Sequence, residues 1–239
     1  SKDKFKLHSS DTPLDGGNGI KVKKEYGWPQ NLFVVGTVNI DETTYMFSPK
    51  VLDRANVIEF RINAKEMKSY LSEPRIVKDL NGEGKGMGRS FVEISKGATK
   101  ANPEELSDAL QQFFIELKEI GAEFGYRTAS EIQTLFSKID SVNPEYANKT
   151  NEKIDIAIMQ KLLPKLHGSR NKLIPVLTAL AILCYGKKGD KKLSEADKKD
   201  VFKKRGELKE KRIYLISLEK IERMYDNVIT NGFTSYAEA

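Results

Sequence analysis

The sequence predicts an α/β plus α protein, in which a short β-rich part precedes a large helical part. A continuous apolar run, NLFVVGTVN at Asn31–Asn39, is typical of a strand that is buried on both faces. Downstream of residue 102, apolar residues recur at helical spacing and helix-start signals repeat. The 239 residues, 39% hydrophobic and 31% charged, suffice for a buried core and exclude a disordered or collagen-like chain.

Residues 1–63 form the predicted β-rich part. Asp15–Gly19 is a turn signal, because three glycines and an asparagine follow an aspartate. A second strand is expected at Asn56–Ile62. Residues 64–102 have little regular period and contain four glycines between residues 82 and 88, so they are predicted to form a linker or mobile loop.

Residues 103–239 form the predicted helical lid bundle. Asn102 and Pro103 are expected to cap and open its first helix, and Thr128 with Glu131 has the spacing of a capping box for the next one. Gly232 is typical of a helix C-cap. The apolar face of the first helix consists of Leu106, Leu110, Phe113, Phe114, Leu117 and Ile120. Further helices are expected at 152–163, 172–185, 194–211 and 217–230.

The composition disfavours several kinds of site. A single cysteine, Cys184, excludes an internal disulfide and a cysteine-based zinc cluster, and two histidines, His8 and His167, disfavour a histidine-rich metal site. We therefore expect no metal bound directly by such clusters. The most apolar stretch, Ile174–Cys184, is about half of a membrane span, and the first residues lack the apolar core of a signal peptide. A cytoplasmic protein without membrane contact is expected.

The positive charge is concentrated in one stretch. Twelve Lys or Arg and six Asp or Glu lie between residues 187 and 212, so this stretch accounts for the formal charge of +6. Lys203, Lys204 and Arg205 are candidates for nucleic-acid binding, because clustered cations release counterions from a polyanion. The interleaved acidic residues favour the alternative, a solvated helical rim.

The segment GTVNIDETTYMFSPKVLDRANVIEF, Gly36–Phe60, is the most informative one. Its strand ends at the polar Asn39, and ligands of open α/β sheets bind at the carboxyl ends of strands. Asp53 and Arg54 then precede the second expected strand. Separately, an asparagine at a strand end is typical of a turn and an Asp-Arg pair of a local ion pair, but together they indicate a ligand site.

This segment resembles the sensor 1 to arginine-finger stretch of AAA+ NTPases, in the branch of MoxR-like chaperones and McrB-like restriction NTPases. FGYRT at Phe124–Thr128 resembles the start of the sensor 2 helix of that family. MQKLLPKLHG at Met159–Gly168 and GFTSYAEA at Gly232–Ala239 resemble parts of its lid and its C-terminus. The resemblance implies a C-terminal remnant of the AAA+ core in residues 1–63, followed by an α-helical lid domain in residues 103–239.

The resemblance also implies roles for the candidate residues. Asn39 would be sensor 1, which holds the attacking water. Arg54 would be the arginine finger, which reaches the nucleotide of the neighbouring subunit and is worth about 10³–10⁵ in rate in such enzymes. Arg127 would contact phosphates in its own subunit and couple the nucleotide state to the position of the lid, and Asp53 would orient Arg54.

A rival interpretation takes VNIDE as a Walker B motif, with Asp41 on magnesium and Glu42 as the base. The apolar run ends at Val35, before these residues, which favours sensor 1. The sequence has no Walker A motif; the nearest segment, Gly82–Ser90, lacks the Gly-Lys-Ser/Thr ending. This chain alone is therefore expected not to hydrolyse nucleotide.

In the family, Walker A and Walker B lie upstream of the matching segment, so the resemblance implies the C-terminal portion of a longer protein. That protein would bind ATP or GTP with Mg²⁺ in a homo-oligomeric ring. It would couple NTP hydrolysis to restriction or remodelling of DNA, as McrB-like 5-methylcytosine restriction proteins do, with a separate nuclease partner. The family's sheet places the P-loop strand between the two strands kept here, so residues 1–63 can be misplaced without the missing half. The alternative is a non-catalytic helical module that binds a partner or a nucleic acid through residues 187–212.

Overall fold

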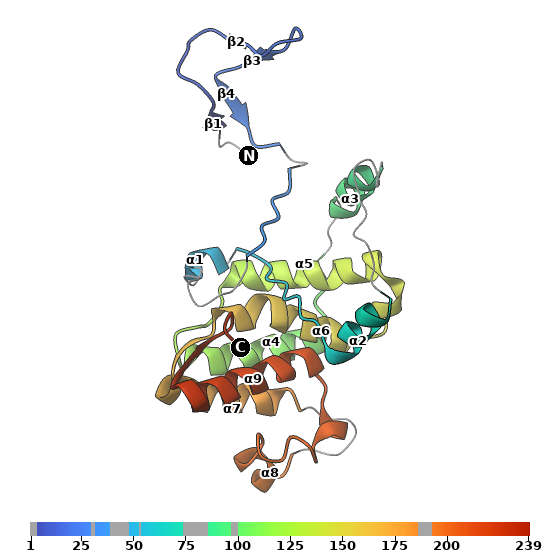
Figure 1. Ribbon diagram of the computed structural model, residues 1–239, viewed down its shortest axis with the longest axis vertical. Helices are drawn as coiled ribbons and strands as arrows, with labels where there is room; N and C mark the ends of the chain where they lie inside the picture. The colour runs from blue at the N-terminus through green and yellow to red at the C-terminus, as the bar shows by residue number, and fades with distance from the viewer. Residues whose placement is uncertain are drawn as a thin grey trace. The chain divides into compact units, whose positions relative to one another are not determined.

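A computed structural model describes residues 4–29, 32–38, 48–52, 54–73, 86–96, 100–185 and 193–239 (Figure 1). The chain divides into two compact units, an N-terminal unit, Ser1–Asn39, and a helical unit, Ile40–Ala239. Within the described ranges, no helix has the length and apolar character needed to cross a bilayer.

The N-terminal unit contains two small antiparallel ladders. They pair β1 (Lys4–Lys6) with β4 (Glu25–Gly27) and β2 (Leu14–Asp15) with β3 (Lys21–Val22). The predicted turn after β2 is confirmed, because the Asp15 carboxylate accepts a hydrogen bond from the Gly17 N–H (2.9 Å) and Asn18 has a positive φ. Every described residue of this unit is at least partly exposed, so the unit has no core of its own.

The strand expected at residues 31–39 is not formed in the part that the structure describes. Residues 32–38 carry no strand, and the side chains of Val34 and Val35 are 78% and 90% exposed. A buried strand needs neighbours that accept and donate its backbone hydrogen bonds and cover its faces. The described residues supply no such neighbours, so this expectation is wrong for the chain by itself.

The helical unit is built around five helices that lie side by side (Figure 1). They are α4 (Glu104–Lys118), α5 (Tyr126–Val142), α6 (Thr150–Ala157), α7 (Arg170–Leu183) and α9 (Leu215–Asn231). A π-helical turn, Ile158–Leu162, continues α6. Near the ends of α7 and α9, β5 (His167–Ser169) pairs with β6 (Phe233–Ser235) in an antiparallel ladder. The helices expected at 152–163, 172–185 and 217–230 are thereby confirmed.

The first bundle helix, α4, carries the apolar face that the sequence predicts. Phe113 is 1% exposed, and its ring lies 6.2 Å from that of Tyr214 before α9. Phe114 and Ile120 pack at the edge of the core. The buried positions repeat every three or four residues: Leu106, Ala109, Leu110, Phe113 and Leu117.

The start of α4 differs from the expected cap. Pro103 is the N-cap residue, and no side chain caps the helix. The Asn102 Oδ1 atom instead accepts hydrogen bonds from Ser107 Oγ (2.8 Å) and Gln133 Nε2 (3.0 Å). Asn102 therefore ties α4 to α5 rather than capping α4.

The end of α9 is closed as expected, and its start is closed by another helix. Gly232 is the C-cap with a φ of 77°, a left-handed conformation that favours glycine. At the start, the Asp155 carboxylate of α6 accepts hydrogen bonds from the N–H groups of Ile216 and Ser217, both 2.8 Å long. Burial raises the pKa of Asp155, and these hydrogen bonds oppose that rise. A buried carboxylate thus satisfies the N-terminus of a neighbouring helix.

Two helices lie in the segment 64–102, where a loop is predicted. They are α2 (Ala64–Ser72) and α3 (Met87–Ser95). Asn63 and Glu66 form a capping box at α2, a helix-start signal that was not included among the predicted ones. Neither helix has a buried residue, so their apolar side chains are largely exposed. A short helix, α1 (Pro49–Leu52), precedes this segment.

The long helix expected at 194–211 is replaced by a short one and a series of turns. Helix α8 (Glu195–Lys199) is followed by turns and by a 3-10 turn, Lys209–Lys211. Val201 and Leu208 are buried, and the ring of Phe202 stacks on Tyr225 of α9 with 3.7 Å between centroids. These tertiary contacts override the helical charge pattern.

Candidate functional site

The structure describes some of the site residues predicted from the sequence and leaves others outside the described residues. Arg54 and Arg127 are described, and both lie in the helical unit with exposed side chains. Asn39 and Asp53 lie outside the described residues, as do Asp41 and Glu42 of the rival Walker B interpretation. The site is therefore built from the two arginines.

Arg54 opens a segment that lies on the helical bundle (Figure 1). The Val57 N–H donates a hydrogen bond to the carbonyl of Gln160 (3.1 Å) in the π turn after α6. From Ala55 to Phe60, half-buried and exposed residues alternate, as in a strand with one covered face. No strand ladder is formed at the second strand expected, 56–62, where helices and not strands hold the segment.

A buried lysine fixes the start of this segment. The Lys161 side chain is 2% exposed, and its Nζ donates hydrogen bonds to the carbonyl of Ala55 (3.0 Å) and to Glu131 Oε2 (2.6 Å). Lys161 lies in the π turn, a helix irregularity that is frequent at functional sites. A lysine is buried so fully only when its charge is paired. The residue after Arg54 is thus tied to α5.

Glu131 pairs with both Lys161 and Arg127. The Arg127 Nε lies 2.8 Å from Glu131 Oε1, one helical turn along α5. Burial raises the pKa of Glu131, but the hydrogen bonds from Lys161 and Arg127 outweigh burial, so the net shift is downward. Glu131 is therefore charged at neutral pH, and the four groups form a continuous network, the arginine–lysine network: Arg127, Glu131, Lys161 and the Ala55 carbonyl.

The start of α5 differs from the capping box that the sequence predicts. Gly125 is the N-cap, with no side-chain hydrogen bond to the helix, and Thr128 is buried within the first turn. Glu131 pairs with the two cations instead of closing a box. The helix therefore presents uncapped N–H groups beside the exposed guanidinium of Arg127, an arrangement that suits an anion such as a phosphate.

A second ion cluster fixes the other end of the segment. Glu59 Oε1 accepts from Lys220 Nζ (3.1 Å), and Glu59 Oε2 accepts from Arg223 Nη2 (3.0 Å), both on α9. Lys220 is 1% exposed and lies 4.1 Å from the centre of the Tyr236 ring. Burial lowers the pKa of Lys220 to about 8, although Glu59 opposes that shift.

Sequence reasoning missed the buried lysines of these networks. Lys161 stands among the mostly apolar residues from Ile158 to Leu166, where a buried lysine has to find a partner. That position was a usable signal. Its partners come from residues 30 and 106 positions away along the chain, and no local pattern identifies them.

The three cations proposed for nucleic-acid contact are all engaged within the helical unit. Lys203 pairs with Asp200 (3.0 Å) and Lys204 with Asp197 (3.1 Å). Arg205 Nη1 lies 2.8 Å from Asp226 Oδ2 on α9. Two of these partners, Asp197 and Asp200, belong to the same stretch, as expected where acidic residues interleave with the cations.

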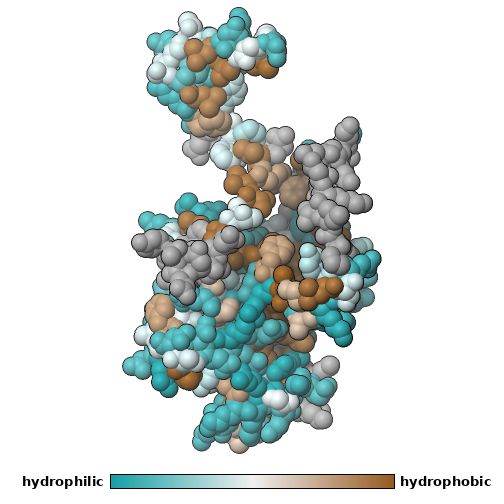
Figure 2. All heavy atoms as spheres, viewed as in Figure 1, coloured by the Kyte–Doolittle hydropathy of each residue, from teal (hydrophilic) through white to brown (hydrophobic). Residues whose placement is uncertain are grey.

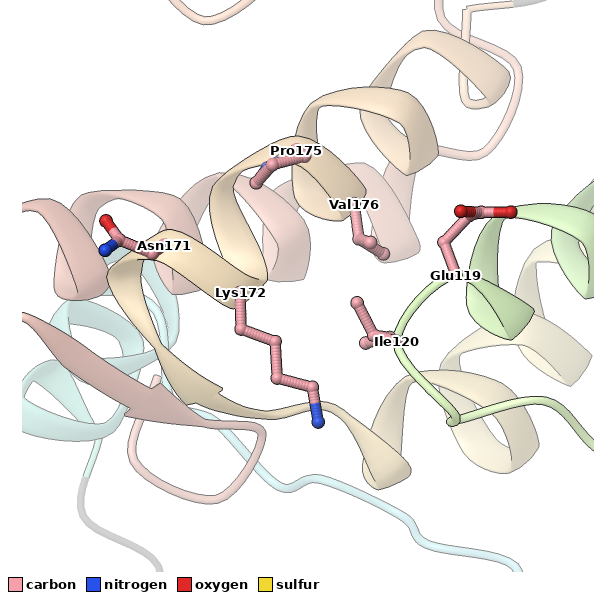
Figure 3. Close-up of a pocket in the computed structure, with 6 residues that line it drawn as sticks. All are labelled: Glu119, Ile120, Asn171, Lys172, Pro175 and Val176. Atoms are coloured by element: carbon pink, nitrogen blue, oxygen red, sulfur yellow. The ribbon is translucent and has the colours of Figure 1, made fainter.

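A surface hollow of about 430 Å³ lies between the end of α4 and the first turns of α7 (Figure 3). Pro175 has no N–H, so the carbonyl of Asn171 lacks its usual helical partner. The lining contains no residue predicted from the sequence: Glu119, Ile120, Asn171, Lys172, Pro175 and Val176. Among the described residues, no three His, Cys, Asp or Glu side chains are grouped to hold a metal ion.

The part of the chain that matches a known protein family lies within the helical unit. A family model described as a domain of unknown function (DUF8727) matches residues 61–233. No curated protein and no solved structure is detectably similar to the chain.

Proposed function

The chain belongs to the DUF8727 family, and we propose that it functions as the C-terminal, nucleotide-sensing part of an AAA+ NTPase. Arg127 contacts a phosphate of the nucleotide bound to its own subunit. Arg54 reaches the nucleotide of a neighbouring copy. The upstream part of a longer protein supplies the Walker A and Walker B motifs.

One observation carries this proposal: buried Lys161 links the two arginines that the sequence resemblance singled out. Its ammonium bonds both the carbonyl of Ala55, next to Arg54, and Glu131, which holds Arg127. A phosphate that draws Arg127 away from Glu131 changes the charge balance around Lys161. That change reaches the segment of Arg54 through a single buried side chain.

The residues at the start of α5 fit the phosphate of a nucleoside triphosphate. The uncapped amides and the Arg127 guanidinium supply donors and positive charge, and arginine binds phosphate through two parallel hydrogen bonds. Bound with Mg²⁺, ATP or GTP supplies the phosphoanhydride that is hydrolysed. The described residues would position phosphate oxygens and neutralise charge; Asp41 and Glu42 lie outside them.

The wider role in DNA restriction rests on the resemblance to McrB-like proteins alone. In that role, copies of the protein form a ring, and a separate nuclease partner cleaves DNA. The alternative is a non-catalytic module that binds nucleic acid through residues 187–212. The ion pairs of Lys203, Lys204 and Arg205 within the helical unit count against this alternative.

The test measures hydrolysis of ATP and GTP by this chain and by the longer protein that contains it. We expect activity only in the longer protein. There, Arg54→Ala lowers kcat by about 10³–10⁵, and Arg127→Ala weakens nucleotide binding by roughly tenfold to a hundredfold. Hydrolysis by this chain alone, or by neither protein, contradicts the proposal.

Arg89→Ala is a matched control. Arg89 makes the same kind of pair one turn along its helix, with its Nε 3.0 Å from Glu93 Oε1, and it lies in the Gly82–Ser90 segment. We expect Arg89→Ala to leave nucleotide affinity unchanged. A loss in Arg89→Ala with none in Arg127→Ala moves the phosphate site to that segment and overturns the assignment.

A further inference from the structure

The N-terminal unit presents three aromatic rings on one face of its β1–β4 ladder. Phe5 lies directly across from Tyr26, with ring centroids 6.3 Å apart and 26° between their planes. Trp28 follows two residues after Tyr26, so it emerges on the same side of the strand, and its ring meets that of Phe5 edge-on at 6.3 Å. These three residues are called the aromatic face.

The aromatic face is exposed to solvent. Trp28 is 52% exposed and Phe5 is 39% exposed. Figure 2 shows hydrophobic side chains gathered at the surface of this unit between hydrophilic ones. The Tyr26 hydroxyl is already engaged, since it accepts a hydrogen bond from the backbone N–H of Lys23 (3.0 Å), so the ring is held in place. Fixed, exposed aromatic rings are typical of binding surfaces.

Lys23 adjoins the aromatic face, because its backbone N–H bonds the Tyr26 hydroxyl. Between residues 4 and 38, the described chain has five lysines against three acidic residues. Lys4 pairs with Glu25, and Lys24 pairs with Asp11. Within the same described residues, Lys21 and Lys23 make no ion pair, and both are exposed. Lys6 makes no ion pair either, but it follows Phe5 directly in β1 and therefore points to the opposite side of the ladder. Lys21 and Lys23 of this unit are therefore available for an anionic partner.

We propose that the aromatic face binds single-stranded nucleic acid, with bases stacked on Phe5, Tyr26 and Trp28 and phosphates held by Lys21 and Lys23. Exposed rings beside unpaired cations match a ligand that alternates flat apolar bases with negative charges. A duplex hides its bases in its own stack, so it offers only the charges. An anionic membrane surface offers no flat rings to stack on.

Trp28 makes the test direct, because it is the single tryptophan of the chain. The 239-residue chain is titrated with oligothymidylate and oligouridylate of about ten nucleotides, a length that fits one such site. Stacking of a base on Trp28 quenches its fluorescence to a saturable limit. Comparing the two oligonucleotides shows whether DNA or RNA is preferred.

Two kinds of variant separate stacking from charge. Phe5→Leu and Tyr26→Leu keep an apolar side chain on the strand and remove the ring, so each weakens binding by on the order of tenfold. Lys21→Gln and Lys23→Gln each reduce the salt dependence, the slope of log affinity against log salt, by about 0.7. An unchanged tryptophan emission maximum in the free variants shows that the surroundings of Trp28 are kept.

The double variant Lys203→Gln/Lys204→Gln is the matched control, because both lysines are ion-paired on the helical unit. It is expected to leave affinity and salt slope unchanged. The proposal is overturned by a control variant that loses binding, by leucine variants that bind as tightly as the parent, or by equal binding of duplex DNA. Quenching by anionic phospholipid vesicles and not by oligonucleotides overturns it as well. None of these outcomes depends on whether the helical unit senses nucleotide.

Discussion

Replacing Lys161 by methionine tests whether this side chain connects the segment of Arg54 to the helical bundle. Methionine keeps the apolar stem and removes the ammonium group. The Ala55 carbonyl then lacks its donor, and Glu131 keeps Arg127 as a partner. An unpaired buried carbonyl costs about 1–3 kcal/mol, and removing one partner of a fully buried ion pair costs about 3–5 kcal/mol. Glu131 is 32% exposed, so water replaces part of the lost contact, and we expect about 2–4 kcal/mol of destabilisation in total.

Lys153→Met is the matched control on the same helix. Lys153 is as buried as Lys161 and pairs with Asp140, at 2.8 Å and 3.0 Å, but it bonds no carbonyl of the segment. Urea unfolding should show destabilisation by both variants. Only Lys161→Met should loosen the segment.

Hydrogen exchange at the Val57 amide separates the two variants. This amide bonds the Gln160 carbonyl, and its protection depends on the segment staying in place. We expect its exchange to accelerate on the order of tenfold or more in Lys161→Met, and to follow only global stability in Lys153→Met. Equal acceleration in both variants, or none in Lys161→Met, would refute the reasoning that Lys161 holds the segment.

Three further outcomes follow from the helical unit. Phe113→Ala should destabilise the chain by about 3–5 kcal/mol in urea unfolding, while Ile115→Ala, at a 53% exposed position of the same helix, should change stability little. Burial lowers the pKa of Lys220 from 10.5 to about 8. Between these two pH values the unfolded chain binds more protons than the folded chain, so the free energy of unfolding should rise with pH there by roughly 3 kcal/mol. Lys220→Met should lack this rise. Burial raises the pKa of the Cys184 thiol, so alkylation should be slow in the folded chain and fast in denaturant, and fast native labelling would contradict the burial.

The sequence predicted those parts of the fold that depend on local periodicity. The apolar spacing of Leu106, Leu110, Phe113 and Leu117 located α4, and Gly232 located the end of α9. A helix of this kind buries one face whatever its neighbours are. Its start was less predictable, because Asn102 bonds to Gln133 on another helix instead of capping its own.

Predictions failed where a contact distant in sequence decides the structure. The apolar run at residues 32–38 predicts a strand, but a strand needs neighbouring strands to pair with, and the described residues do not provide them. A long helix was predicted for the charged stretch after Ser194, but the chain forms turns there, where Phe202 stacks on Tyr225 of α9. In the candidate site, Arg54 and Arg127 could be proposed from motifs, whereas the role of Lys161 follows only from its burial between them.

The bond between Asp155 and Ser217 joins residues 62 positions apart, and it supplies the cap that α9 lacks within its own sequence. α9 therefore cannot complete its first turn until α6 is in place, and closing so long a loop costs chain entropy before any cap is gained. Folding of the bundle is thus expected to be cooperative between α6 and α9, with α9 docking late. A nascent chain still missing α9 would expose the buried carboxylate of Asp155 to water.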